Sequence, residues 1–213
     1  MSTNAYLYSE WKKECVIIDP GADDAELIQH MNIKNLRPRG IIFTHGHIDH
    51  ISAATGLRRY FEKMDIRVPV AVHEADAAYL GRAALRLHRK SLAKASTGAS
   101  DYYERTILEL PKPDLLVRAG DHPFDSNLMV IHTPGHTPGS ICLYSESQEL
   151  LFSGDTLFFE GIGDSDLTEK EKRSLLESVR TQLFILPRST RVFPGHGPFT
   201  TLEREIMHNP HFN

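Results

Sequence analysis

The stretch Thr44-His45-Gly46-His47-Ile48-Asp49-His50 places three histidines and one aspartate within a few consecutive positions. Given the 12 histidines in 213 residues, composition alone predicts about 0.002 matches to this pattern, so chance does not explain it. In extended backbone, residues two apart project to the same side, so His45 and His47 can converge on one metal ion. His50 breaks this alternation, which points to a second ion.

The residues on either side indicate where this cluster lies in the fold. Ile41-Ile42-Phe43 is typical of a strand buried on both faces, and a helix is expected from about Ile51 to Phe61. Active sites in layered α/β folds favour the carboxyl ends of strands. We therefore expect the cluster to lie at the end of a buried strand.

Three later loops each place one residue of a metal-binding type directly after an expected strand. They are Thr133-Pro134-Gly135-His136-Thr137-Pro138-Gly139-Ser140, Ser153-Gly154-Asp155-Thr156 and Pro194-Gly195-His196-Gly197. The expected metal ligands are His45, His47, Asp49, His50, His136, Asp155 and His196. Five imidazoles and two carboxylates are too many for one tetrahedral ion, so they indicate two divalent ions that share a carboxylate and a water.

Outside these motifs, short strands alternate with helices in both halves of the chain. Strands are expected at 5–8, 15–18, 41–43, 68–72, 115–117, 128–132, 141–144, 150–153 and 191–193, with Pro38-Arg39-Gly40 as a turn. Helices are expected from about Asp23, over much of 74–109, and after the capping-box pair Thr168 and Glu171. The pattern predicts an α/β fold with mixed sheets covered by helices, in a single domain spanning residues 1–213.

Composition excludes several classes of protein. A formal net charge of −4 excludes a broadly basic nucleic-acid binder, and two cysteines exclude a disulfide framework or a four-thiolate zinc site. No apolar run approaches the roughly 20 residues needed to span a bilayer. The first five residues have neither the basic nor the apolar region of a secretory signal. We expect a cytoplasmic protein without nucleic-acid or membrane partners, and the sequence does not indicate its oligomeric state.

The four motifs THGHIDH, TPGHTPGS, SGDT and PGHG, in this order, resemble those of the metallo-β-lactamase superfamily. The resemblance runs from Asn4, through Ile17-Ile18-Asp19-Pro20-Gly21, to His196, and is strongest to short, single-domain glyoxalase II-like (hydroxyacylglutathione hydrolase-like) enzymes. It implies an αββα sandwich of two mixed sheets flanked by helices, with the metals at one edge. It also implies that His45, His47 and His136 bind the first metal, that Asp49, His50 and His196 bind the second, and that Asp155 bridges them.

The activity that the resemblance implies is hydrolysis of a small acyl compound, above all a thioester such as an acyl-glutathione. Two cations would lower the pKa of a bridging water, so that hydroxide attacks the acyl carbon at neutral pH. Asp155 and Asp49 are the expected catalytic residues, Asp155 as the shared ligand and Asp49 as the group that accepts a proton after attack. Zinc is the expected metal, although iron and manganese also suit imidazole-rich sites.

Three features depart from the family pattern. A strand usually precedes the Thr3-Asn4-Ala5-Tyr6 segment, so an N-terminal edge strand is missing or the start is misplaced. Asp164 stands where many relatives have a cation, which argues against an anionic substrate such as a glutathione thioester. Only 17 residues follow His196, so no C-terminal glutathione-binding helical domain is expected.

Other functions remain open. A persulfide dioxygenase with one iron shares the scaffold, but the complete second ligand set and Gly154-Asp155-Thr156 favour the hydrolase. A metal-binding module without catalysis is the non-enzymatic alternative. His50 argues against a β-lactamase, and the net charge of −4 argues against an RNA-processing nuclease. Asp19 is interpreted as a turn former or as a residue that orients a ligand, and His132 as a buried core residue rather than a support for the metal centre.

Overall fold

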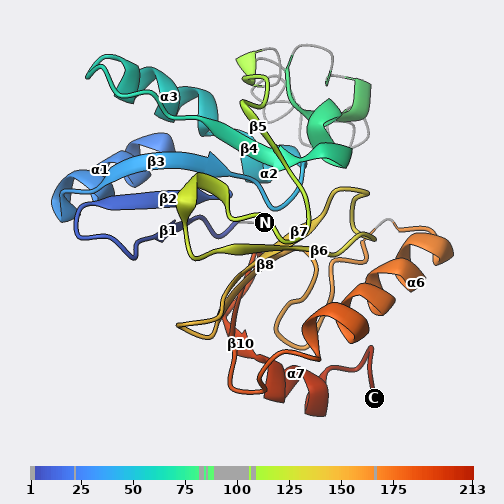
Figure 1. Ribbon diagram of the computed structural model, residues 1–213. Coiled ribbons are helices and arrows are strands. Elements are labelled where there is room, and N and C mark those ends of the chain that lie inside the picture. Colours follow the sequence, from blue (N-terminus) through green and yellow to red (C-terminus); the bar gives the residue numbers. More distant parts are fainter. Residues whose placement is uncertain are drawn as a thin grey trace.

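The computed structural model of the chain describes residues 3–21, 23–81, 84, 86–88, 106, 109–165 and 167–213. In these residues two five-stranded sheets pack face to face, and helices cover their outer faces (Figure 1). This arrangement confirms the expected αββα sandwich of two mixed sheets. In the described ranges, no helix is long and apolar enough to cross a bilayer.

The first sheet has the strand order β1-β2-β3-β4-β5. Its strands are β1 (Tyr6–Tyr8), β2 (Glu14–Ile18), β3 (Arg37–Ile42), β4 (Val70–His73) and β5 (Leu115–Val117). β1 pairs antiparallel with β2, and the other three pairings are parallel. Helices α1 (Asp24–Lys34) and α3 (Ala54–Glu62) lie on its outer side, and the short helices α2 (Ile48–Ile51) and η1 (Glu74–Tyr79) follow β3 and β4.

The second sheet has the order β10-β9-β8-β7-β6, and only the pairing of β8 with β9 is parallel. Its strands are β6 (Met129–His132), β7 (Ile141–Ser145), β8 (Leu150–Gly154), β9 (Arg191–Pro194) and β10 (Thr200–Thr201). Helices α6 (Glu169–Ser178) and α7 (Leu202–His208) lie on its outer side, α6 continuing into the π-helical turn η4 (Val179–Leu183) (Figure 1). The short 3-10 helix η3 (Pro123–Asp125) precedes β6. The expected capping box between Thr168 and Glu171 begins α6.

Neighbouring residues of a strand point to opposite faces of the sheet, and this alternation divides the core into layers. In β2, Val16 and Ile18 pack between the two sheets, whereas Cys15 and Ile17 pack beneath the helices of the first sheet. β7 follows the same rule, with Leu143 on the inner face. Because neighbouring strand residues face opposite sides, a slip of one residue would exchange the two layers, so the register of these strands is strongly specified.

The Pro38-Arg39-Gly40 segment is part of β3 and not the expected turn. The register with β2 shifts between Cys15 and Val16, and this irregularity accommodates a proline that has no N–H to donate. Gly40 is required because the ring of Phe124 occupies the space that a Cβ atom would fill. In this strand the proline therefore marks a bulge and the glycine a close contact, and not a turn. Of the stretch expected to be helical over 74–109, the structure has η1 and a helical segment at 86–88, and residues 82, 83, 85, 89–105, 107 and 108 lie outside the described part.

Glu205 anchors α7 to the second sheet and to the turn at 158–161. Its buried carboxylate accepts hydrogen bonds from Thr200 Oγ1 at 2.6 Å, from the amide of Glu160 at 2.9 Å and from Asn209 Nδ2 at 2.8 Å. Each buried donor left without a partner costs about 1–3 kcal/mol. We therefore expect Glu205→Ala to lower the free energy of unfolding by about 3 kcal/mol in urea titrations.

The matched control for this prediction is Glu203→Ala. Glu203 is an exposed residue in the first turn of the same helix, where a carboxylate contributes less than about 1 kcal/mol. Both variants are compared with the parent protein at equal metal content, since bound metal stabilises the folded state. Equal losses in the two variants would show that the buried hydrogen bonds of Glu205 are not what anchors the helix.

Candidate metal centre

The seven expected ligands lie at one edge of the sandwich, close to strand ends in both sheets. His45 follows β3 of the first sheet. His136, Asp155 and His196 follow β6, β8 and β9 of the second sheet. The strands thus bring residues from position 45 to position 196 to one place, as the position of the motifs predicts.

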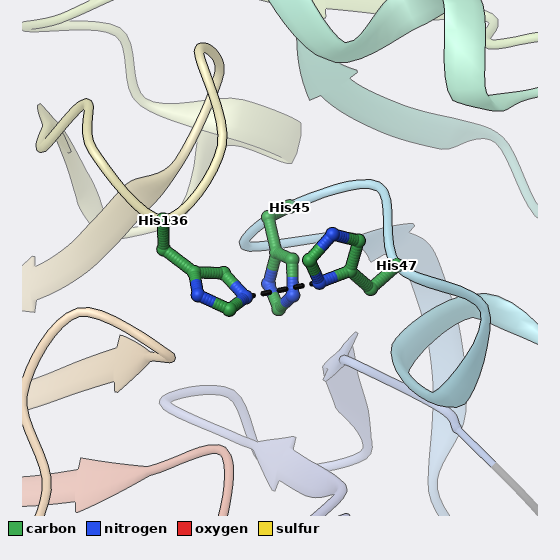
Figure 2. Close-up of side chains that lie close together, drawn as sticks. All are labelled: His45, His47 and His136. Atoms are coloured by element: carbon green, nitrogen blue, oxygen red, sulfur yellow. Dashed lines mark hydrogen bonds between the residues drawn. The ribbon is translucent and has the colours of Figure 1, made fainter. Parts of the chain in front are cut away.

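The first group consists of His45, His47 and His136. One donor atom from each lies within 4.8 Å of the others, and His136 Nε2 is 2.9 Å from His47 Nδ1. Figure 2 shows the three imidazoles converging from two separate loops. The ring of His45 is fully buried and lies 4.7 Å, centroid to centroid, from each of the other two.

The second group consists of Asp49, His50 and His196. Their donor atoms also lie within 4.8 Å of one another, with His196 Nε2 3.4 Å from His50 Nε2 and 3.3 Å from Asp49 Oδ2. His50 is in α2 and fully buried, whereas 38% of the Asp49 side chain is exposed. The change from extended backbone to helix after His47 turns His50 toward this second group.

Asp155 lies between the two groups. Its Oδ1 is 3.3 Å from His50 Nε2, and its Oδ2 is 3.5 Å both from His136 Nε2 and from His196 Nε2. A single carboxylate is therefore within 3.5 Å of members of both groups. This is the geometry that a ligand shared by two ions requires.

His45 Nε2 is buried without a hydrogen-bond partner among the described residues, and the buried Asp155 Oδ1 has only its 3.3 Å ion-pair contact with His50 Nε2. A buried polar atom without a partner costs about 1–3 kcal/mol, and native proteins rarely leave one. A cation between the imidazoles and the carboxylate would satisfy both atoms. Imidazole nitrogens and carboxylate oxygens suit divalent zinc, iron and manganese, so the donor set fits two metal ions.

Hydrogen bonds behind the imidazoles determine which nitrogen faces the centre. Thr44 Oγ1 donates to Asp19 Oδ2 at 2.6 Å, so it is left to accept a proton from His45 Nδ1 at 3.1 Å. His136 Nδ1 donates to the carbonyl of Gly163 at 2.7 Å, because a carbonyl can only accept. In both residues Nε2 is thereby left free as the metal-binding atom.

Asp19 has both of the roles that the sequence left open. It adopts a positive φ of 48° before Pro20, a conformation that aspartate tolerates in turns. Its buried carboxylate also accepts from the amide of Thr44 at 2.7 Å and lies 3.0 Å from His50 Nδ1. Asp19, His45 and His50 form a third group whose donor atoms are close enough together to hold an ion. The hydrogen bonds from Thr44 and the contact with His50, however, occupy both oxygens of Asp19. It therefore orients His50 and does not need to bind metal.

The environment keeps two imidazoles of the first group in the form that binds metal. Burial, followed by the neighbouring imidazoles, holds the pKa of His45 well below its ordinary value. Burial, together with His136, lowers the pKa of His47 to about 4. Both side chains are therefore neutral at physiological pH, as metal ligation requires.

The carboxylates are held in their charged form. Burial opposes ionisation of Asp155, but His50 and His196 keep its pKa well below the usual range. Burial likewise opposes ionisation of Asp49, and the hydrogen bond to His196 and the charge of His50 outweigh it and lower the pKa. Asp155 and Asp19 in turn raise the pKa of His50 despite its burial. A metal at this position would replace that proton on His50.

Several residues near the centre differ from what the sequence predicts. His132 is half-buried, stacks on His73 at a centroid distance of 4.1 Å, and lies with Nε2 3.0 Å from the carbonyl of Pro138 in the loop of His136. It thus supports this loop and is not a core residue. Asp164 forms a 2.7 Å ion pair with Lys172 of α6, so its negative charge is compensated.

Asp76 is a residue of this region that the sequence patterns missed. It is fully buried and hydrogen-bonded to both loops of the first group. It occurs three residues after the end of β4, where an acidic residue at a strand end was the available signal.

Comparison with known proteins places the chain in a family. The family model of the metallo-beta-lactamase superfamily matches residues 1–196. The protein named "Probable metallo-hydrolase YqgX" of Bacillus subtilis is 35% identical over 217 residues, covering 100% of this chain and 93% of the relative. The hydroxyacylglutathione hydrolase GloC of Haemophilus influenzae is 30% identical, covering 99% of this chain and 92% of the relative.

Solved structures agree with this placement. The crystal structure of the BLEG-1 B3 metallo-beta-lactamase has a TM-score of 0.83 and 36% identity, covering 99% of this chain and 94% of that chain. TTHA1623, in a di-iron-bound form, has a TM-score of 0.75 and 33% identity, covering 98% and 94%. Together with two groups of ligands around one shared carboxylate, these similarities support a centre with two metal ions. The chain belongs to the metallo-β-lactamase superfamily.

Proposed function

We propose that this protein is a dinuclear metal-dependent hydrolase of thioesters such as acyl-glutathiones, with zinc as its metal. The main support is the position of Asp155, within 3.5 Å of members of both ligand groups. Similarity to the hydroxyacylglutathione hydrolase GloC of Haemophilus influenzae supports the thioester substrate. The core shared by both sheets supports a single domain over residues 1–213.

The residues have distinct roles in the proposed reaction. His45, His47 and His136 would hold one ion, Asp49, His50 and His196 would hold the other, and Asp155 lies near enough to both groups to be shared. When bound, the two ions lower the pKa of a water between them toward 7 and polarise the acyl oxygen.

Asp49 is the group proposed to take up the proton. With 38% of its side chain exposed, it lies at the solvent side of the cluster, where a proton that it accepts can pass on to water. The thiolate that leaves from a thioester needs little protonation. The reaction therefore requires no further acid near the sulfur.

The surroundings of the centre are compatible with an acyl-glutathione. Lys172 compensates the charge of Asp164, so the carboxylate that departs from the family pattern does not repel an anionic substrate. The ring of Phe158 lies 6.0 Å from that of His196. It provides an apolar surface beside the second ligand group, suited to an acyl chain.

Elemental analysis followed by a substrate panel on the same sample tests this proposal. We expect two zinc equivalents per chain and hydrolysis of an acyl-glutathione that is lost on chelation and restored by zinc. His208→Ala, which removes an exposed histidine of α7, is the control and should retain both.

The panel also contains a lactone, a persulfide and, because of the similarity to BLEG-1, a β-lactam. Oxygen uptake with the persulfide and a single bound iron would favour the dioxygenase. A fully loaded protein that hydrolyses the β-lactam or the lactone but no thioester would overturn the proposed substrate class. A loaded protein inactive on every member would favour a binding module.

A further inference from the structure

Asp76 is a buried carboxylate whose hydrogen bonds end in the two loops that hold the first ligand group. Its Oδ2 accepts from the amide of Gly46 at 2.9 Å and from Thr137 Oγ1 at 2.7 Å. Its Oδ1 accepts from the amide of Gly139 at 2.7 Å. Gly46 lies between His45 and His47 in the sequence, and Thr137 follows His136, so each loop is held next to a ligand.

The two loops belong to different sheets. The segment 44–47 follows β3 of the first sheet, and the loop 133–140 connects β6 and β7 of the second. Asp76 lies in η1, directly after β4 of the first sheet. Its carboxylate therefore joins the two sheets at the edge where the ligands gather.

The loop 133–140 packs so closely against the Asp76 carboxylate that small changes in either would shift the hydrogen bonds between them. A Cβ atom on Gly139 would lie 2.6 Å from Asp76 Cγ, so the loop can approach the carboxylate only because this residue is a glycine. Among the described residues, Asp76 is in none of the three groups whose donor atoms could together hold an ion. Asp76 therefore acts on the metal centre through its hydrogen bonds to the two loops and not as a metal ligand.

We propose that Asp76 is a positioning residue that sets the distance between His136 and the pair His45 and His47, and with it the affinity of the first group for metal. The inference rests on the metal centre and not on the substrate. A second link, the bond from the amide of Ile141 to the carbonyl of Thr44 at 2.8 Å, remains when Asp76 is changed. Loss of Asp76 should therefore alter the centre while leaving the sheets joined.

Asp76→Asn tests the proposal with little change of shape. The amide oxygen can still accept from Gly46 and Thr137, but the amide NH₂ group then faces the N–H of Gly139. Asp114→Asn is the matched control, since Asp114 also accepts from a backbone amide, that of Val70 at 3.0 Å, but next to β5 and outside the ligand groups.

The readouts are titration of the metal-free protein with Co²⁺, followed by visible absorption, and urea unfolding of the same samples. For Asp76→Asn we expect affinity for one of the two ions to fall about 10–100-fold, as for other partners of metal ligands, with a changed cobalt spectrum. Asp114→Asn should keep both affinities and the spectrum. Parental cobalt affinity and spectrum in Asp76→Asn, or the same loss in Asp114→Asn, would overturn the inference.

A second pair of variants applies if Asp76→Asn does not fold. Thr137→Val removes the hydroxyl that donates to Asp76, and Thr137→Ser retains it. We expect weaker cobalt binding for the valine variant and recovery for the serine variant, and equal binding by the two would reject the proposal. A parent protein that binds two ions but cleaves no thioester would overturn the proposed function alone.

Discussion

Replacing Asp155 with alanine is expected to remove metal and activity together. The carboxylate is the contact common to both ligand groups, with His50 on one oxygen and both His136 and His196 on the other. Without it, each group loses a charged ligand and the two cations lose the anion between them. We expect less than two metal equivalents per chain and a decrease in kcat/KM of roughly 10²- to 10³-fold or more.

The measurement is metal content and thioester turnover on the same preparation. His208→Ala is again the control, and His47→Ala should resemble Asp155→Ala if the first group also binds metal. Circular dichroism of each metal-free protein separates loss of metal from loss of fold. Near-parental turnover by an Asp155→Ala protein that holds two ions would contradict the assignment of Asp155 as the shared ligand.

The gathering of these seven side chains at one edge could be predicted because their signals are local. His45, His47 and His50 stand within a single short motif, and each later ligand stands in a tight loop after an apolar strand. Strand ends of a layered fold meet at one edge, so local placement was enough to bring distant residues together. Division of the ligands into two groups needed the family resemblance, since spacing alone does not show which imidazoles face each other.

The supporting residues could not be predicted because their contacts are not local. Asp76 reaches loops that are 30 and 61 positions away in the sequence, and its one local signal, an acidic residue shortly after a strand, is shared with solvated carboxylates. Lys172 of α6 compensates the negative charge of Asp164, and the pattern of charges in the sequence does not predict this ion pair. Pro38 belongs to β3 through an irregularity in the pairing with β2, which the local Pro-Arg-Gly pattern does not show.

Similarity of fold leaves the substrate undecided for a physical reason. Relatives and structures similar to this chain include a hydroxyacylglutathione hydrolase and a B3 metallo-beta-lactamase. A metal centre that activates water serves the hydrolysis of either acyl compound, so selectivity lies in the walls around the centre. Among the described residues, Phe158 and Tyr79 have rings within 6.0 Å of the ligand imidazoles His196 and His47.

Asp19→Ala is expected to cause a large loss of both stability and metal binding. It leaves three buried donors without their acceptor, the amide and hydroxyl of Thr44 and Nδ1 of His50. At about 1–3 kcal/mol each, with partial relaxation, the free energy of unfolding should fall by about 3–5 kcal/mol. Metal affinity should fall about 10–100-fold because His50 loses the partner that orients it.

Asp19→Asn separates the two roles of this residue. Asparagine tolerates the positive φ before Pro20, so the turn is kept and the loss of stability should be smaller than in the alanine variant. The amide NH₂ cannot accept from Thr44, whose hydroxyl is then free to donate to His45 Nδ1 and to move the imidazole proton to Nε2. That proton would block the metal-binding atom of the first group. Cobalt binding should therefore be weakened about as much in Asp19→Asn as in Asp19→Ala, and parental binding in Asp19→Asn would mean that Asp19 acts only through the turn.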